Sequence, residues 1–168
     1  MDDRRELPAT ESGSAAPGRP GPDAFERALG ALAHRERTTA ELAAWLRQRG
    51  FATGAVEAAL TRLIEIGELD DERFARRYAE DKRELRGWGA ERIREALLSK
   101  GLERSLIDAA LADGIEQELE RAVELLERRE ASLDDDAQRG RALAYLARRG
   151  YDSATAYEAI RRSERRAA

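Results

Sequence analysis

Apolar side chains recur every three or four positions along most of this sequence, the spacing that places them on one face of a helix. Segments 25–32 and 119–126 show this spacing, and the clearest stripe consists of Val56, Ala59, Leu60, Leu63 and Ile64. From Phe25 onward no proline occurs, and the good helix formers Ala, Arg, Glu and Leu dominate. No segment alternates apolar and polar residues for long enough to indicate a strand. The pattern therefore predicts an all-α fold.

The chain contains an internal repeat of about 50 residues, a period typical of helical arrays. Segments 45–51, 96–102 and 145–151 read WLRQRGF, ALLSKGL and YLARRGY, with glycines at positions 50, 101 and 150. A glycine that follows a helix can take the left-handed conformation, and the apolar residue after it can fold back onto that helix. The basic residue before each glycine complements the negative end of the helix dipole. Each segment is therefore predicted to end one helix and lead into the next.

A further amphipathic helix precedes each of these segments, at 25–34, 70–85 and 115–130. The sequence therefore predicts three tandem three-helix repeats that form an elongated, curved array. Helix-capping residues support the helix starts, since Thr38 and Glu41 match a capping box and aspartates stand at 70–71, 134–136 and 152. The predicted repeats span 23–69, 70–113 and 114–168.

Residues 1–22 hold all four prolines, and Gly, Ser and Ala fill much of the remainder. Such a segment cannot bury enough apolar surface to offset the entropy that ordering costs. We expect a disordered N-terminal arm there, which is either an inert tail or a partner-binding segment.

Charged residues make up 38% of the chain, yet 34 acidic and 30 basic residues leave a net charge of only -4. A protein that coats nucleic acid usually carries surplus Lys and Arg to neutralise phosphates. The near-balance therefore argues against DNA as the main ligand and favours a protein surface, where interspersed charges set register.

The sequence contains no cysteine, which excludes disulfides, a thiol nucleophile and cysteine-ligated metal sites. No run approaches the roughly 18 apolar residues that a membrane span requires. The acidic N-terminus has no apolar stretch behind it, so it does not match a secretory signal. We expect a cytoplasmic protein without membrane contact.

Two motifs near the middle of the chain are more specific. Segment 67–75 reads GELDDERFA, and segment 86–93 reads RGWGAERI, followed by Leu97 and Gly101. This resembles the RecX family, in which G-x-L-D-D-x-R-F-A precedes R-G-x-G-x-x-R-I-x-x-x-L-x-x-x-G. Trp88 departs from the small polar or basic residue that is common between those glycines. The resemblance covers about 25 to 164 and implies a regulator that binds the RecA recombinase and its filament on single-stranded DNA, usually restraining it.

Three consecutive acidic residues and the single histidine are the candidate reactive groups. Asp70, Asp71 and Glu72 could hold a divalent ion, as in a nuclease, but consecutive residues fan out on a helix, and a helix cap explains the aspartates. His34 lacks a second histidine or a cysteine with which to build a metal site. We therefore predict no catalytic residue, no cofactor and no metal.

Basic residues around the second repeat are the candidate partner-binding residues, for the recombinase or for DNA. The alternatives are a solvated helical face for the arginines and a local core position for Trp88. The expected partner is the RecA filament, bound by a monomer, and a weak direct contact with DNA is left open. The alternative function is a helical DNA-binding protein. The candidates are Arg83, Arg86, Trp88, Arg92, Arg94 and Lys100, with Arg161 and Arg162 in a second cluster.

Overall fold

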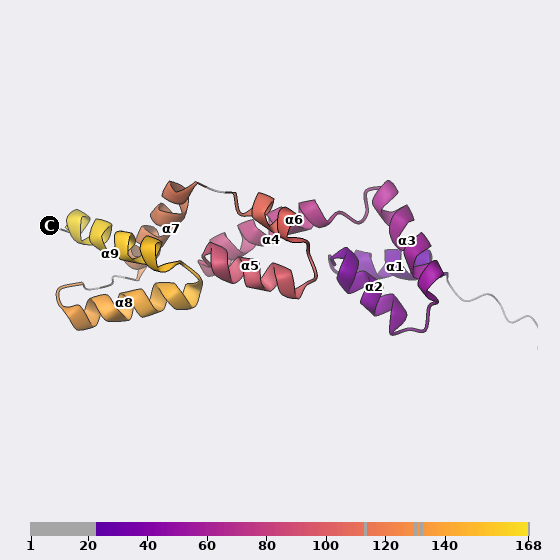
Figure 1. Cartoon of the computed structure of the whole chain (residues 1–168), viewed down its shortest axis with the longest axis horizontal. Coiled ribbons are helices and arrows are strands. Elements are labelled where there is room, and N and C mark those ends of the chain that lie inside the picture. The colour runs from indigo at the N-terminus through magenta and orange to yellow at the C-terminus, as the bar shows by residue number, and fades with distance from the viewer. Residues whose placement is uncertain (1–22, 113, 130, 132, 168) are drawn as a thin grey trace, which may run out of the picture.

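The computed structural model describes residues 23–112, 114–129, 131 and 133–167, and these contain nine helices and no strand (Figure 1). The all-α prediction is confirmed, while the arm predicted at 1–22 lies outside the described residues. Within the described ranges, no helix is long and apolar enough to cross a membrane. The helices are α1 (Ala24–His34), α2 (Thr39–Arg47), α3 (Thr53–Glu65), α4 (Asp71–Arg86), α5 (Ala90–Ser99), α6 (Arg104–Ala110), α7 (Ile115–Arg128), α8 (Asp136–Arg149) and α9 (Ser153–Ala167).

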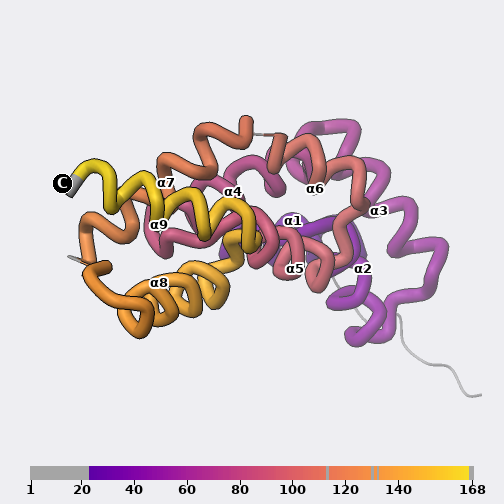
Figure 2. Tube along the Cα trace, turned by 60° about the vertical axis from the view of Figure 1, so that its left-hand side comes forward, coloured from indigo at the N-terminus to yellow at the C-terminus, as the bar shows by residue number. Residues whose placement is uncertain are grey.

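The helices form three triplets that follow one another in a row, as Figures 1 and 2 show from two sides. We call α1–α3 the first unit, α4–α6 the second unit and α7–α9 the third unit. Each unit encloses its own hydrophobic core, because the apolar stripes of its three helices face one another. The prediction of tandem three-helix repeats in an elongated array is confirmed.

The repeated glycines end the middle helix of each unit in the same way. Gly50, Gly101 and Gly150 have φ angles of 84°, 79° and 89°, the left-handed region that favours glycine. The next residue donates its backbone N–H to the carbonyl of the leucine five positions earlier, at 3.4, 3.3 and 3.2 Å in the three units. These turns confirm the predicted helix ends and aim the third helix of each unit back along the second.

Side-chain caps fix where several helices begin. Thr38 and Glu41 form the predicted capping box of α2, and Asp70 accepts the N–H of Arg73 at the start of α4. Asp135 caps α8 in a second capping box with Gln138. Each cap satisfies backbone N–H groups that the first turn of a helix leaves without partners.

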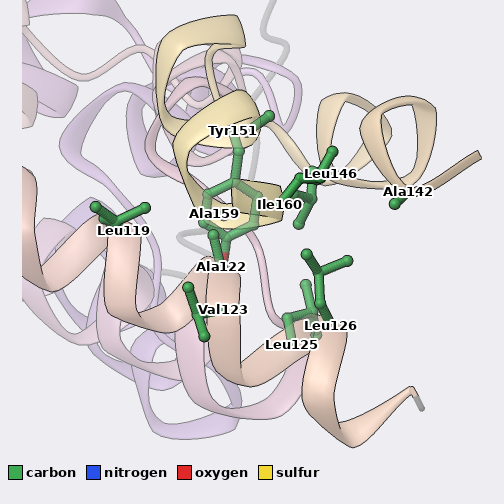
Figure 3. Close-up of a cluster of buried hydrophobic side chains, with 11 residues drawn as sticks. Leu119, Ala122, Val123, Leu125, Leu126, Ala142, Leu146, Tyr151, Ala159 and Ile160 are labelled. Atoms are coloured by element: carbon green, nitrogen blue, oxygen red, sulfur yellow. The ribbon is translucent and has the colours of Figure 1, made fainter. Parts of the chain in front are cut away.

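The third core shows how one unit is held together (Figure 3). Leu119, Val123 and Leu126 of α7 face the apolar side chains of α8 and α9. Tyr151 points from the α8–α9 connection toward α7 and is 4% exposed. Burial, together with the nearby Glu118 carboxylate, raises the pKa of Tyr151 to about 12. This phenol therefore stays neutral and acts as a core side chain.

Candidate partner-binding surface

The middle helices α2, α5 and α8 lie end to end and run in the same direction (Figure 1). The C-terminal end of α8 meets the N-terminal end of α5, and the C-terminal end of α5 meets the N-terminal end of α2. Carbonyl groups at a helix end are partly negative and amide groups at a helix start are partly positive, so both meetings are favourable. We call the contact between the first and second units the first joint, and that between the second and third units the second joint.

Backbone atoms of both units meet at the second joint, and the Glu118 carboxylate also accepts the N–H of Ala90 at 2.8 Å. The N–H of Gly89 donates to the carbonyl of Arg149 at 2.8 Å, and the N–H of Glu91 donates to the carbonyl of Gly150 at 3.1 Å. A Cβ on Gly89 would lie 2.5 Å from the Gly150 oxygen, so this close approach requires glycine. The Arg92 guanidinium adds a hydrogen bond of 2.8 Å to the carbonyl of Arg148.

Side chains build the first joint. The buried Thr38 hydroxyl donates to the carbonyl of Lys100 at 2.7 Å, and the Lys100 ammonium lies 2.9 Å from the Glu41 carboxylate. Partial burial raises the pKa of Glu41, but hydrogen bonds from Lys100 and from the Thr38 N–H outweigh that effect, so the net pKa lies below the ordinary value. The Thr39 N–H donates to Asp71 at 2.8 Å. Asp71, which was predicted as part of the cap of α4, therefore fastens the two units together.

The end-to-end helices carry most of the surplus positive charge. We call residues 39–50, 90–101 and 136–150 the middle-helix row. The row holds nine basic residues and only four acidic residues, in a chain whose net charge is -4. Helix α7 shows the opposite balance, with five glutamates and two arginines. The middle-helix row therefore has an excess of basic residues and α7 an excess of acidic residues, a difference that the net charge of the whole chain does not reveal.

Several candidate residues already bind carbonyl or carboxylate groups within the chain: Arg92, Arg94, Lys100 and Arg162. Arg92 and Lys100 hold the two joints, as described above. Arg94 pairs with Asp108. Arg162 pairs with Glu116 and, at 3.6 Å, with Glu120. A role for these four in binding a partner would require them to exchange an internal contact for an external one.

The other four candidates lie in three different settings. Arg83 is half-buried beside a hollow of about 460 Å³ between α4, α6 and α7. Trp88 packs against the second core, and the Arg92 guanidinium lies 4.3 Å from its ring centroid. Arg86 and Arg161 are exposed and form no ion pair with any described residue. The structure therefore gathers Arg86, Trp88 and Arg92 near the second joint and leaves Arg161 and Arg162 on α9.

Two further arginines join the group at the second joint. Arg148 is exposed, and the half-buried Arg149 reaches the backbone carbonyl of Arg86. Sequence reasoning treated Arg149 only as a dipole partner before the repeated glycine. No sequence pattern indicates that this turn packs against a residue about 60 positions earlier, which is why these arginines were missed.

The structure does not bring the candidate reactive residues together at one site. Among the residues that the structure describes, no group of three His, Asp or Glu side chains could hold a metal ion. Asp70 caps α4, Asp71 binds the Thr39 N–H, and His34 is exposed at the end of α1. The two aspartates therefore act in a helix cap and in a contact between units.

Comparisons with known proteins cover nearly all of the described chain. Family models described as the first, second and third three-helix domains of RecX match residues 24–63, 70–111 and 116–160. The chain is 34% identical over 163 residues to "Regulatory protein RecX" of Streptomyces coelicolor, a match that covers 92% of this chain and 87% of that protein. It is 38% identical over 139 residues to "Regulatory protein RecX" of Trichlorobacter lovleyi, covering 78% of this chain and 89% of the relative.

Two solved structures share the fold. A crystal structure of RecX from Lactobacillus salivarius superposes with a TM-score of 0.77 at 19% identity, over 84% of this chain and 94% of that one. A crystal structure of a regulatory protein RecX gives a TM-score of 0.69 at 27% identity, over 82% of this chain and 70% of that one. At 19% identity, the first of these likenesses supports the fold alone.

Proposed function

The chain belongs to the RecX family, and from this we propose that it binds the RecA recombinase and its nucleoprotein filament. In our proposal it lowers recombinase activity during recombination and DNA repair, acting as a monomer in the cytoplasm. The observation that carries the proposal is the row of three joined units, which presents one extended surface along the length of the molecule. A surface of this kind can contact more than one protomer of a filament.

The proposed effect needs only binding energy. A protein that binds one state of a filament more tightly than another shifts the balance between those states by the difference in affinity. The filament carries out ATP hydrolysis, and this chain changes how often the active state is populated. Such a mechanism requires neither a cofactor nor a metal ion.

Recombinase ATP hydrolysis on single-stranded DNA tests the proposal. We expect the full chain to reduce the hydrolysis rate of the cognate RecA in a dose-dependent manner. A triple variant, Arg47→Glu, Arg141→Glu and Arg148→Glu, should be weaker, because it reverses charge on the middle-helix row at exposed residues that form no ion pair within the described chain.

The matched control reverses three exposed arginines outside the row: Arg27→Glu, Arg104→Glu and Arg128→Glu. It changes net charge by the same amount and should retain nearly full effect. A folded wild-type chain that leaves ATP hydrolysis unchanged at tens of micromolar would refute the proposed function.

The basic middle-helix row also favours a second candidate function, direct binding to DNA. Phosphate contacts release counterions, so the affinity for DNA should fall steeply as salt rises. A fluorescence anisotropy titration with single-stranded DNA at several salt concentrations measures that slope. Tight, salt-sensitive binding to DNA with no affinity for the recombinase would favour this second function over the first.

A further inference from the structure

A groove of about 490 Å³ lies between α8 and α9 in the third unit. Its apolar surface comes from Leu143, Ile160 and the ring of Tyr157, which is 58% exposed. An aromatic ring that remains this accessible beside aliphatic side chains offers a ready contact for a second protein. Charged residues form the rim: Asp136, Arg139, Arg161 and Glu164.

A glycine keeps the groove open. Gly140 lies within α8, and a Cβ built there would meet nothing within 4 Å. Alanine would stabilise the helix by about 0.5–1 kcal/mol relative to glycine, so α8 itself does not require glycine at this position. The absence of a side chain leaves the floor of the groove accessible from outside.

The other two units lack this arrangement, and they serve as internal controls. Gly140 stands ten positions before the repeated glycine of its unit, and Tyr157 stands seven positions after it. Aligned in the same way, the first unit has Ala40 and Glu57, and the second unit has Glu91 and Asp108. The combination of a glycine and an exposed aromatic is therefore specific to the third unit and is not a demand of the three-helix fold.

Within the part of the chain that the structure describes, Arg161 is the rim residue whose positive charge forms no ion pair. Arg139 binds both Asp136, at 2.9 Å, and Glu164, at 2.6 Å, so these three charges satisfy one another. Arg161 forms no ion pair with any described residue. The next arginines of α9 do have acidic partners: Arg162, Arg165 and Arg166 pair with glutamates of α7 or α9.

We propose that this groove binds a short segment of the protein partner that carries apolar side chains and a carboxylate. The apolar side chains would cover Gly140 and pack on Leu143 and Tyr157, while the carboxylate would pair with Arg161. Arginine and tyrosine are the residue types that most often dominate protein interfaces. This inference rests on the proposed function, which makes the recombinase filament the source of the segment.

Filling the groove and reversing its unpaired charge test the inference separately. Gly140→Leu should fill the floor, and Arg161→Glu should repel the carboxylate. Each should weaken binding of the folded full chain to the RecA filament by about tenfold or more, measured by anisotropy of a labelled chain. Arg161→Lys retains the charge and should recover most of the affinity.

Matched controls exist for both changes. Gly30→Leu places the same side chain on α1 at another exposed helical glycine with open space around it. Arg165→Glu reverses a charge one turn further along α9, at a residue that already pairs with Glu158. Both controls should bind within about twofold of the wild type, and circular dichroism should show that all variants are folded.

The possible results separate the two proposals. If the wild type binds the filament and the groove variants bind equally well, the groove assignment is wrong and the proposed function stands. If the wild type does not bind the filament, both fail. If sedimentation shows a dimer of the wild type that Gly140→Leu dissociates, the groove holds a second copy of the chain, which also overturns the inference.

Discussion

Both joints connect the middle helices of neighbouring units end to end, but they do so through different kinds of contact. At the second joint, carbonyl groups that end α8 accept hydrogen bonds from the backbone at the start of α5. At the first joint, the Thr38 hydroxyl, the Asp71 carboxylate and the ion pair between Lys100 and Glu41 make the connection. The middle helices meet end to end in both cases, so the repeat determines the direction of approach and individual residues determine how it is fastened.

The glycines at the joints show the same difference. A Cβ on Gly89 would meet three backbone atoms of Gly150 and Tyr151 within 2.7 Å. A Cβ on Gly101 at the first joint would meet only the Cβ of Ala40, at 2.5 Å. Backbone contacts do not depend on pH and depend little on salt, whereas an ion pair depends on both. We therefore expect the second joint to be rigid and the first joint to yield more readily.

The largest expected effect comes from Gly89→Ala. The φ angle of Gly89 is -81°, which alanine adopts freely, so the only obstacle is the clash with the third unit. We expect a loss of about 1–3 kcal/mol of stability, seen as a lower urea midpoint, and separation of the second and third units.

Gly54→Ala is the control, because a Cβ there meets nothing within 4 Å. It should be neutral or should stabilise the chain by up to about 1 kcal/mol. If Gly89→Ala behaves like Gly54→Ala, the close backbone approach at the second joint does not exist in solution.

A smaller loss is expected from Lys100→Met at the first joint. This change leaves the Glu41 carboxylate, whose side chain is only 22% exposed, without its ammonium partner. We expect a cost of about 1–2 kcal/mol, with much of it recovered in the double variant with Glu41→Gln. Urea unfolding of the four proteins gives the coupling energy, and a value near zero would show that the pair does not fasten the joint.

The smallest expected effect is a weakening of the first joint when the pH is lowered. Because the folded pKa of Glu41 lies below its ordinary value of about 4.5, the ion pair contributes fully above that pH. Its contribution is lost as pH falls from about 4.5 through the folded pKa. Fluorescent labels at Ala58→Cys and Ser105→Cys, in a chain without native cysteine, should report a wider first joint in acid.

Two comparisons sharpen this measurement. Labels at Ser105→Cys and Ala154→Cys span the second joint and should show a smaller change over the same pH range. The Glu41→Gln variant should reduce the pH dependence at the first joint. Equal responses at the two joints would contradict the distinction between them.

Local physics made most of the fold predictable. A period of 3.6, a capping box at Thr38 and left-handed glycines at 50, 101 and 150 act within one or two helical turns, so the sequence displays them directly. The roles of Gly89 and Asp71 could not be found in this way. Each depends on a backbone group of another unit, and for Gly89 that group lies 60 positions away in the chain.

The candidate surface was less predictable for the same reason. The sequence does not reveal the carboxylates with which Arg94, Lys100 and Arg162 pair in the folded chain. For Lys100, the partner carboxylate lies 59 positions away. Net charge was misleading as a guide to the partner, because the value of -4 for the whole chain conceals the excess of basic residues in the middle-helix row. Charge balance describes a chain, whereas a partner meets one face of it.

Because α2, α5 and α8 run in the same direction, the two ends of the molecule are different. Turning the molecule end for end exchanges the arginine-bearing end of α2 for the three aspartates at the start of α8. The two orientations therefore present different charges to a partner. A filament grown by head-to-tail addition of identical subunits is directional too. If the chain binds a filament as proposed, its two possible alignments along that filament differ in energy, so one of them is favoured.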